Sequence, residues 1–504
     1  MQSIKEAYAS HQRIAVLLLL LILAFALLLR IKNLGGESLW LDEASSVKLA
    51  QLPVHDILDE VARDDVHPPL YYLMLHYWVR LAGDSEAGVR LLSVLLGVLS
   101  ILVIYKVASL LFDPQTGFLS ALLLSVSLLH IAFSQEARMY ALLCLLSLLS
   151  IYLFLTLLRG ESGLLFAAYV LSTALLPYTQ VYGWFIIIAQ NIFFLSLYFL
   201  SNDIFKRLFK RWVVAQALTV ALFLPWLPAM MQQVSRVQKN FWIPVPSLRL
   251  LSLTVDEYIV SNSLQWIHLL LIALSIIALW GSKRGNASFD SKAHPDASRP
   301  AWFQDRDKLY LLLAWLLTPV LVPFILSYFM RPIFLPKYTI AALPAFVILA
   351  ARGLMEVRFA PARLFLVALI LFLSLSGLRR GYWGTQRKED WRDAVGYFNQ
   401  MAKPNDLVLI YPSFSQPPFD YYAKRSDVIK APLPDFGSEM TADEAYEMLD
   451  EAIKGHDRVW LVLHSLENES TLLMKKHLGE RYNLRAQDVL PGIEVYLYEG
   501  ERTD

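Results

Sequence analysis

Residues 14–29 read IAVLLLLLILAFALLL, an apolar run that ends at Arg30. A run of this kind, close to the roughly 20 residues that cross the hydrocarbon core of a bilayer, predicts a membrane-spanning helix. Similar blocks recur along the 504 residues, of which 56% are hydrophobic and 18% charged. This distribution excludes disordered, collagen-like and coiled-coil chains. The sequence therefore predicts a polytopic α-helical membrane protein.

Dividing the chain into segments of spanning length predicts about eleven transmembrane helices. Their ranges are 14–29, 89–112, 117–132, 142–158, 164–177, 184–200, 213–228, 267–280, 309–328, 338–351 and 364–376. Lys and Arg gather in the loops 206–211, 283–308 and 352–363, which we therefore expect on the cytoplasmic side. The N-terminus is then cytoplasmic, and an odd number of crossings places the C-terminus on the extracytoplasmic side.

The chain changes character after about residue 380. Residues 407–411, 459–464 and 493–499 have the pattern of strands, and residues 391–401, 442–453 and 470–478 that of helices. We therefore expect a membrane domain over 1–380 and a small extracytoplasmic α/β domain over 381–504. The outer loop 30–90, counted with the membrane domain, is too long for a turn and contains half-apolar stretches typical of interfacial helices.

The composition limits which residue types can bind a metal or catalyse a reaction. The net charge of +1 gives no indication of a nucleic-acid partner. The single cysteine, Cys144, lies inside an apolar run, so we expect no internal disulfide, no cysteine-based metal site and no CxxC redox motif. Any catalysis must use carboxylates, His, Arg, Lys and Tyr.

The stretch Ser134-Gln135-Glu136-Ala137-Arg138-Met139-Tyr140 interrupts the apolar run 117–158 with almost no loop on either side. Placing Glu136 and Arg138 at a bilayer edge costs about 2 to 3 kcal/mol per residue, so these side chains should face protein or an aqueous cavity. The alternative is a Glu–Arg pair that only fixes two helix ends.

A second polar stretch, Trp40-Leu41-Asp42-Glu43, follows the first predicted span. Partial desolvation at the interface would raise the pKa of a carboxyl group there and make it a competent base. Ordinary solvated charge, or acidic residues at a helix start, is the alternative.

The stretch Asp64-Asp65-Val66-His67-Pro68-Pro69-Leu70-Tyr71-Tyr72 is the third candidate. Its prolines favour an extended segment followed by a helix start, with Tyr71 and Tyr72 in the first turn. Asp64, Asp65 and His67 carry ligand groups for a divalent cation, but a plain turn explains them too.

The fourth stretch, Arg331-Pro332-Ile333-Phe334-Leu335-Pro336-Lys337-Tyr338, pairs two cations with aromatic residues. Arg331 offers a bidentate fork and Lys337 a point charge for a phosphate. Anchoring to lipid head groups is the alternative. Further hydrogen-bonding and stacking groups on this side are Tyr178, Gln180, Tyr182 and Trp242, which packing in an aromatic belt would also explain.

Counting crossings places all four stretches on the extracytoplasmic side. We therefore expect one cavity with acids for an acceptor hydroxyl and cations for a phosphate, a combination that suits group transfer from a phosphorylated lipid carrier.

These stretches resemble motifs of the GT-C glycosyltransferases, in particular the bacterial relatives of protein O-mannosyltransferases and of the aminoarabinose transferase that modifies lipid A. The resemblance runs through about the first 380 residues and includes Asp84, Arg90 and Leu343-Pro344. It implies a GT-C fold and a monosaccharide, hexosyl or pentosyl, passed with inversion from a polyprenyl-phosphate donor to an extracytoplasmic lipid, glycan or protein. It also implies location in the cell (inner) membrane.

The resemblance also implies residue roles. Asp42 matches the acidic base of the family, with Glu43 beside it, and Arg331 and Lys337 match cations that neutralise the leaving polyprenyl phosphate. The expected substrate-binding residues are Asp65, His67, Tyr71, Glu136, Arg138, Tyr140, Tyr182, Arg331, Lys337 and Tyr338. We expect no obligatory metal or other cofactor, with a divalent cation as the alternative.

Two other classes compete with an enzyme. A secondary transporter also carries intramembrane charges, but it usually places them near the midplane in repeated halves. A scaffold that only anchors its outer domain would not need eleven spans.

Overall fold

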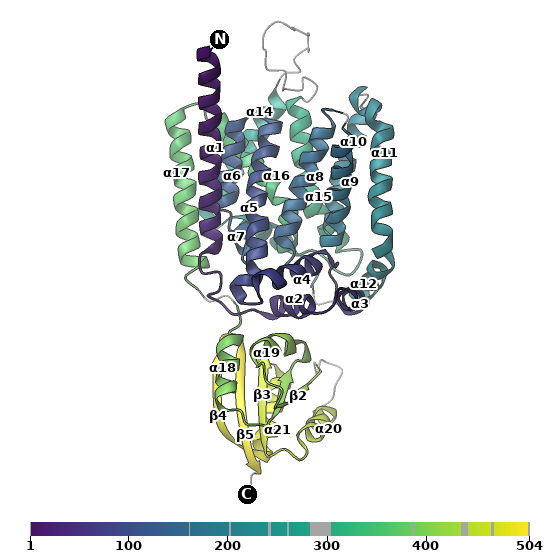
Figure 1. The fold of residues 1–504 in the computed structure, drawn as a ribbon, viewed down its shortest axis with the longest axis vertical. Helices are drawn as coiled ribbons and strands as arrows, with labels where there is room; N and C mark the ends of the chain where they lie inside the picture. Colours follow the sequence, from purple (N-terminus) through teal and green to yellow (C-terminus); the bar gives the residue numbers. More distant parts are fainter. Residues whose placement is uncertain are drawn as a thin grey trace. The chain divides into compact units, whose positions relative to one another are not determined.

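Apolar helices dominate the computed structural model (Figure 1). It describes residues 2–160, 162–200, 203–239, 243–259, 262–282, 304–385, 388–434, 442–464 and 468–501. The helices before residue 384 are α1 (Gln2–Ile31), α2 (Leu41–Gln51), α3 (Val54–Asp64), α4 (Leu70–Ala82), α5 (Glu86–Leu111), α6 (Pro114–Ser125), α7 (Leu128–Ser134), α8 (Tyr140–Leu157), α9 (Gly163–Thr179), α10 (Gly183–Phe199), α11 (Asp203–Phe223), η1 (Leu224–Trp226), α12 (Leu227–Lys239), α13 (Leu248–Tyr258), α14 (Asn262–Gly281), α15 (Asp305–Leu326), η2 (Pro336–Ala341), α16 (Leu343–Glu356), α17 (Ala360–Gly377) and η3 (Leu378–Tyr382).

The later elements alternate between helices and strands. They are α18 (Trp391–Met401), β1 (Leu407–Tyr411), η4 (Ser413–Ser415), α19 (Gln416–Tyr422), β2 (Ile429–Pro432), α20 (Ala442–Ile453), β3 (Arg458–His464), α21 (Glu469–Arg481), β4 (Tyr482–Leu490) and β5 (Ile493–Glu501). The predicted fold class, a polytopic helical protein with a small C-terminal α/β part, is confirmed.

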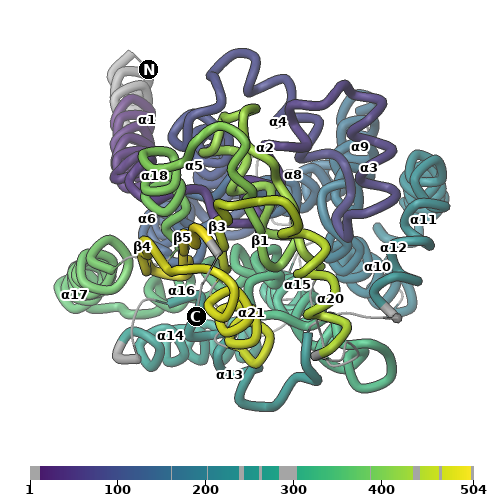
Figure 2. The backbone as a smooth tube through the Cα atoms, turned by 90° about the horizontal axis from the view of Figure 1, so that it is seen from below, coloured from purple at the N-terminus to yellow at the C-terminus, as the bar shows by residue number. Residues whose placement is uncertain are grey.

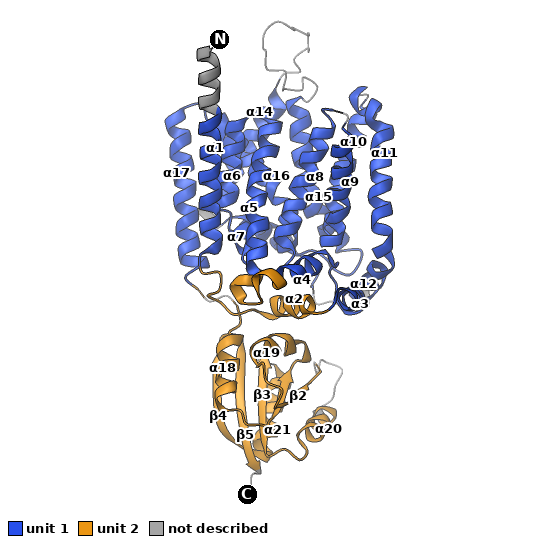
Figure 3. Ribbon diagram, in the orientation of Figure 1, with its two compact units in different colours: residues 1–32, 53–78, 90–384 blue, residues 33–52, 79–89, 385–504 orange. Residues whose placement is uncertain are grey.

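Two compact units divide the chain (Figure 3). Unit 1 comprises residues 1–32, 53–78 and 90–384, and unit 2 comprises 33–52, 79–89 and 385–504. The loop 30–90 is expected with the membrane domain, whereas two of its segments, 33–52 and 79–89, pack with the C-terminal residues. Polar contacts hold these segments: Arg392 forms an ion pair with Glu86 at 2.9 Å and donates to the backbone oxygen of Gly35 at 3.0 Å.

Seven helices among the described residues are long and apolar enough to cross a membrane. They are Gln12–Ile31, Glu86–Leu111, Tyr140–Leu157, Asp203–Val237, Leu264–Gly281, Asp305–Leu326 and Ala360–Tyr382. Two shorter apolar helices, α9 and α10, and a bent pair, α6 with α7, cover three more predicted spans. The predicted count of eleven is not confirmed, because the block 338–351 is divided between η2 and the short helix α16.

Lipid-facing helices are distinguished by how little of their apolar surface the protein covers. Only 17% of the most apolar window is buried in α1 and 17% in the span containing α17, against 72% in α8. Figure 2 places α1, α17 and α11 at the periphery of unit 1. Apolar surface of this extent is stable only against lipid or another apolar partner.

The predicted span 117–132 is a broken helix, with α6 and α7 bent by 63°. A break frees backbone carbonyls that water cannot reach. The buried guanidinium of Arg30 donates to the Ser125 and Leu124 oxygens at 3.1 and 3.3 Å and to His130 Nδ1 at 2.6 Å. Arg30, at the end of α1, therefore stabilises the bend.

Close helix packing depends on a small residue in α16. A Cβ atom added to Gly353 would lie 1.9 Å from the backbone oxygen of Leu271 in α14. Membrane helices use such residues to bring backbones together. Gly353 is therefore required by the α14–α16 contact.

The sheet of unit 2 has the order β2-β1-β3-β5-β4. β1 pairs parallel with β2 and β3, and β5 pairs antiparallel with β3 and β4. Every residue of β1 is buried, as expected for a central strand covered on both faces.

Alternate residues of β1 serve different cores. Leu407 and Leu409 pack in a cluster with α20 and α21, whereas Val408 and Ile410 pack in another with α18 and α19. The predicted strands and helices of this part are all present. The elements α19, β2 and β4 were not predicted. Both strands lie at the edges of the sheet, where β2 is short and β4 largely exposed, so that their polar residues obscure the strand pattern.

Candidate active site

The stretch Ser134–Tyr140 joins α7 to α8, and its first half fixes the end of α1. Ser134 Oγ accepts from Arg30 Nε at 3.2 Å. The Gln135 amide donates to the backbone oxygens of Arg30 and Lys32, both at 2.8 Å. Gln135 thus satisfies carbonyls at the C-terminal end of α1, and Ser134 holds the Arg30 guanidinium; both are structural tasks.

The second half of the stretch faces other predicted site residues. Arg138, 5% exposed, donates through Nη1 to the hydroxyl of Tyr72 at 3.4 Å. The ring of Tyr140 stacks on that of Tyr338, with centroids 6.1 Å apart and planes 23° apart. The motif thus links α4 to η2 at the α7–α8 junction.

Tyr338 lies at the centre of an aromatic cluster, which we define as His67, Tyr140, Tyr182 and Tyr338. Its ring centroid is 6.3 Å from that of His67 and 5.5 Å from that of Tyr182. The Tyr182 hydroxyl also donates to the backbone oxygen of Ile333 at 3.0 Å. Four separate stretches of the chain therefore converge within unit 1.

Cationic groups border this cluster. Lys337 Nζ lies 5.6 Å from the centre of the Tyr338 ring. Arg331 and Glu136 are half-buried in the segments that lead into η2 and α8. The arrangement offers ammonium and guanidinium donors beside phenol hydroxyls, the groups that hold a phosphate and a sugar.

Asp65 stabilises its own turn instead. Its Oδ1 atom accepts from the backbone N–H groups of Val66 and His67 at 2.6 and 2.9 Å. Arg236 of α12 donates to the Asp65 backbone oxygen at 2.8 Å. This geometry matches the plain turn that the sequence analysis kept as the alternative, and it fixes the backbone that leads into His67.

Tyr71 and Tyr72 face different partners. The hydroxyl of Tyr71 lies 2.9 Å from Ser93 Oγ, and Ser93 donates to the backbone oxygen of Arg138 at 3.4 Å. Tyr72, not chosen from the sequence, is the residue whose hydroxyl meets the Arg138 guanidinium. Adjacent helical positions point about 100° apart. The sequence could have indicated Tyr72 only with knowledge of the helix's rotation.

Glu257, near the end of α13, is a second residue that the sequence analysis missed. Desolvation raises the pKa of its carboxyl group, and the charge of nearby Lys337 opposes the rise. The next residue, Tyr258, contacts Thr339 Oγ1 at 2.7 Å through its hydroxyl. This adds a carboxyl group close to the cationic side of the aromatic cluster. Trp242, also proposed from the sequence, lies outside the described residues.

Asp42 and Glu43 belong to unit 2, in the first turn of α2. Glu43 is fully buried, and its Oε2 atom lies 2.8 Å from Nζ of Lys388. Asp42 is half-buried. The two neighbouring carboxylates therefore differ in burial, and Glu43 forms an ion pair with this lysine. Whether all four polar stretches share one cavity stays a prediction.

Metal ligands do not cluster in the part of the chain that the structure describes. There, no group of three or more His, Cys, Asp or Glu side chains is placed to hold an ion.

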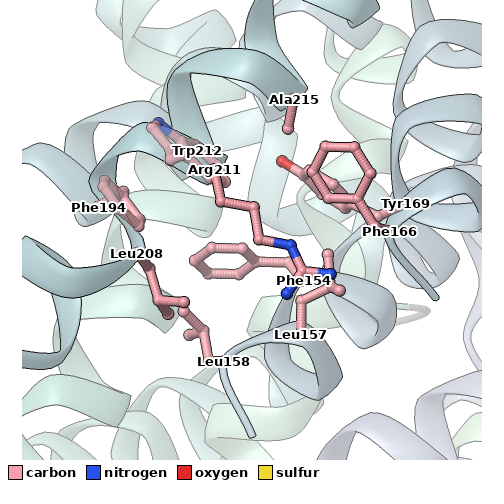
Figure 4. A pocket seen from close by; sticks show the side chains of 10 residues that line it. All are labelled: Phe154, Leu157, Leu158, Phe166, Tyr169, Phe194, Leu208, Arg211, Trp212 and Ala215. Carbon is pink, nitrogen blue, oxygen red and sulfur yellow. The ribbon is translucent and has the colours of Figure 1, made fainter. Parts of the chain in front are cut away.

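A cavity of about 30 Å³ lies between α8, α9, α10 and α11 (Figure 4). Aromatic and aliphatic side chains line it, and it has room for only a water molecule or two. Arg211, at its edge, donates to the Ser162 oxygen at 3.0 Å and lies 5.2 Å from the ring of Phe166. These contacts identify a packing defect rather than a substrate site.

Several solved structures superpose on most of this chain. ArnT from Cupriavidus metallidurans, in the apo state, superposes with a TM-score of 0.62 at 15% identity, over 95% of this chain and 97% of that one. The same protein bound to undecaprenyl phosphate gives 0.60. The chain has the GT-C fold. The archaeal oligosaccharyltransferase AglB from Archaeoglobus fulgidus, in complex with an inhibitory peptide and a dolichol-phosphate, gives 0.56 at 12% identity over 94% of this chain and 73% of that one.

Sequence comparison agrees with the GT-C fold over a shorter range. A family described as dolichyl-phosphate-mannose-protein mannosyltransferase matches residues 66–229, which include His67, Tyr72, Arg138, Tyr140 and Tyr182. An uncharacterized protein of Aquifex aeolicus (strain VF5) is 27% identical over 195 residues, which is 37% of this chain and 39% of that relative. The GT-C resemblance is confirmed at the level of the fold, and the protein is a multi-pass membrane protein.

Proposed function

We propose that this chain is a membrane glycosyltransferase that moves a hexose or pentose, with inversion, from a polyprenyl-phosphate donor to an extracytoplasmic lipid, glycan or protein. One observation carries the proposal: Arg138 and Tyr72 meet beside an aromatic cluster that four distant stretches build. A buried guanidinium at such a place suits an anionic ligand, because it offers several charge-assisted hydrogen bonds.

The cations take the donor phosphate. Arg138, Arg331 and Lys337 stabilise the negative charge that grows on the phosphate as the glycosidic bond breaks. Preorganised charge of this kind is usually the largest part of a catalytic effect. Tyr140, Tyr182 and Tyr338 offer ring faces and hydroxyl groups to the sugar, and His67 and Glu136 complete the polar wall.

Asp42 is the base. In the reaction, the bond between the sugar C1 atom and the phosphate oxygen breaks, and a bond between C1 and the acceptor oxygen forms on the opposite face. The acceptor proton passes to the Asp42 carboxylate, and polyprenyl phosphate leaves with the electron pair. Proton transfer to a positioned base in the transition state contributes about 10²- to 10⁴-fold to rate.

The remaining assignments follow from the same proposal. The protein lies in the cell (inner) membrane, with a cytoplasmic N-terminus and unit 2 outside. The chemistry needs no resident metal, with a divalent cation as the alternative. Addition of a chelator, and then of Mg²⁺ or Mn²⁺, separates these two cases in a turnover assay.

A transporter remains the competing class, because broken helices such as α6–α7 line substrate paths in many transporters. In this chain the carbonyls freed by the break accept from Arg30, so they are not open to an ion. This favours the enzyme.

The test uses purified full-length protein with undecaprenyl phosphate carrying a radiolabelled hexose or pentose, and an envelope extract as the source of acceptors. Release of undecaprenyl phosphate with label transferred to the extract supports glycosyl transfer. Label that accumulates inside proteoliposomes, with the donor intact, would support transport and contradict the proposal.

A further inference from the structure

The first turn of α2 is held by two consecutive residues that lie almost 350 positions further along the chain. Trp40, the residue before the helix, provides no side-chain cap. Glu389 takes that place: its Oε2 atom accepts from the backbone N–H of Leu41 at 3.4 Å. A carboxylate at a helix N-terminus also meets the positive end of the helix dipole.

Glu389 is itself fixed by unit 2. Its Oε2 atom accepts from Trp391 Nε1 at 2.9 Å, and its Oε1 atom lies 2.9 Å from Nε2 of His464. Ser38, three residues before Leu41, donates to the Glu389 backbone oxygen and accepts from the Trp391 backbone N–H. The segment before α2 is therefore attached to the start of α18.

Lys388 forms an ion pair with Glu43, which lies in the same first turn of α2. Its Nζ atom lies 2.8 Å from Glu43 Oε2, with the Glu43 side chain 0% and the Lys388 side chain 9% exposed. A buried pair of this kind is very sensitive to loss of one partner, because the remaining charge has no water around it. The Glu43 carboxylate is thus buried, and Lys388 balances its charge. Asp42, the preceding residue, points about 100° away around the helix axis.

We propose that Lys388 and Glu389 are positioning residues that set the orientation of Asp42 by holding the first turn of α2, and that Glu43 is their anchor rather than a second base. This inference rests on the proposed function, in which Asp42 accepts the proton of the acceptor. Its consequence is that the C-terminal part contributes to catalysis.

Turnover of the full-length protein tests this. Glu389→Gln and Lys388→Met should lower kcat by about 10- to 100-fold, because a misoriented base loses reactivity, while KM for the undecaprenyl-phosphate sugar stays within about twofold. Lys388→Arg should keep most of kcat. The matched controls Lys476→Met and Glu480→Gln, an exposed pair on α21, should leave both constants unchanged. Equal loss of kcat in the controls, or a KM change without a kcat change, would overturn the inference.

A double-mutant cycle protects the test against misfolding. Lys388→Met alone leaves a buried carboxylate without its cation, and it can unfold unit 2. The combined variant Glu43→Met with Lys388→Met removes both charges. Its kcat and its unfolding temperature should be no lower than those of Glu43→Met alone. If the losses of kcat in the two single variants simply add in the double variant, Lys388 does not act through Glu43, and its role as a positioning residue is overturned.

Hydrogen exchange separates failure of this inference from failure of the proposed function. In Glu389→Gln, amides of α2 should exchange at least about tenfold faster than in the wild type, while those of β1 and β3 stay protected. Unchanged exchange in α2 would overturn the inference whatever the activity. Faster exchange in a protein that transfers no sugar would leave α2 positioned as described and contradict only the proposed function.

Discussion

The Nη1 atom of Arg138 lies 3.4 Å from the hydroxyl oxygen of Tyr72, although the two residues are 66 positions apart. The contact brings the helix that follows His67 to the junction that precedes α8. It thereby unites two polar stretches which, in the sequence, are separated by the whole of α5.

Arg138→Ala and Lys337→Ala should weaken binding of the polyprenyl-phosphate sugar by about tenfold or more each, since a hydrogen bond to a charged group contributes about 1.5–3 kcal/mol. Binding can be measured with the labelled donor on protein in detergent. Lys206→Ala, on the exposed face of α11, is the control. Wild-type affinity in both site variants would place the phosphate elsewhere.

Asp42→Asn should leave the protein folded and reduce turnover by at least about 100-fold, because an amide cannot accept the acceptor's proton. Initial rates and a thermal unfolding curve measure the two effects. Asp443→Asn, on exposed α20, repeats the same change away from α2. Wild-type turnover in Asp42→Asn would exclude this residue as the base.

Arg30→Met should lower the unfolding temperature, because it removes the Arg30 donor from the buried Ser125 carbonyl, at about 1–3 kcal/mol, and leaves the Leu124 carbonyl with its backbone donor Ser127. Arg30→Lys should recover little, since one ammonium cannot reproduce the planar fork. Unfolding is followed in detergent, with Arg13→Met, on an exposed part of α1, as the control. A wild-type unfolding temperature for Arg30→Met would mean that the bend is stable without it.

Glu389 should stabilise the folded protein by an amount that depends on pH. Burial acts to raise its pKa, but hydrogen bonds from His464, Trp391 and Leu41 outweigh burial and hold the pKa below the ordinary 4.5. A group with a depressed folded-state pKa stabilises above its unfolded value and loses that effect as the pH falls through the folded one. The stability difference between wild type and Glu389→Gln should therefore be full above pH 4.5 and shrink in stronger acid.

Protection of the α2 amides, compared between wild type and Glu389→Gln from pH 7 downwards, follows that difference in the full-length protein. Asp443→Asn, whose carboxyl group is exposed on α20, should show no such trend. If the stability difference between wild type and Glu389→Gln grew as the pH fell, the pKa of Glu389 would not be lowered in the folded protein.

Gly353→Ala should destabilise unit 1 by about 1–3 kcal/mol, because the new methyl group meets the Leu271 backbone oxygen and two helices must separate. Gly396→Ala in α18 is the matched change without a neighbour within 4 Å, and it should stabilise by about 0.5–1 kcal/mol. Thermal unfolding compares the two. Equal effects would mean that α14 and α16 can move apart at no cost.

The sequence by itself determined the class of the protein. Apolar blocks near spanning length indicate helices in lipid, and a short continuous apolar run such as β1 can be recognised as a buried strand, since both patterns depend on neighbours in the chain. It also indicated His67, Arg138, Tyr140, Tyr182 and Tyr338, because charge and aromatic residues at a membrane edge need an explanation.

Tertiary structure alone decided which of these residues meet and what each one does. Helix rotation selects Tyr72 over Tyr71 as the partner of Arg138, and the turn geometry assigns Asp65 to its own backbone. Contacts across more than 300 residues bring Lys388 to Glu43 and divide the outer loop between two units. Such pairings depend on how whole elements pack in three dimensions, and no local pattern of residues encodes them.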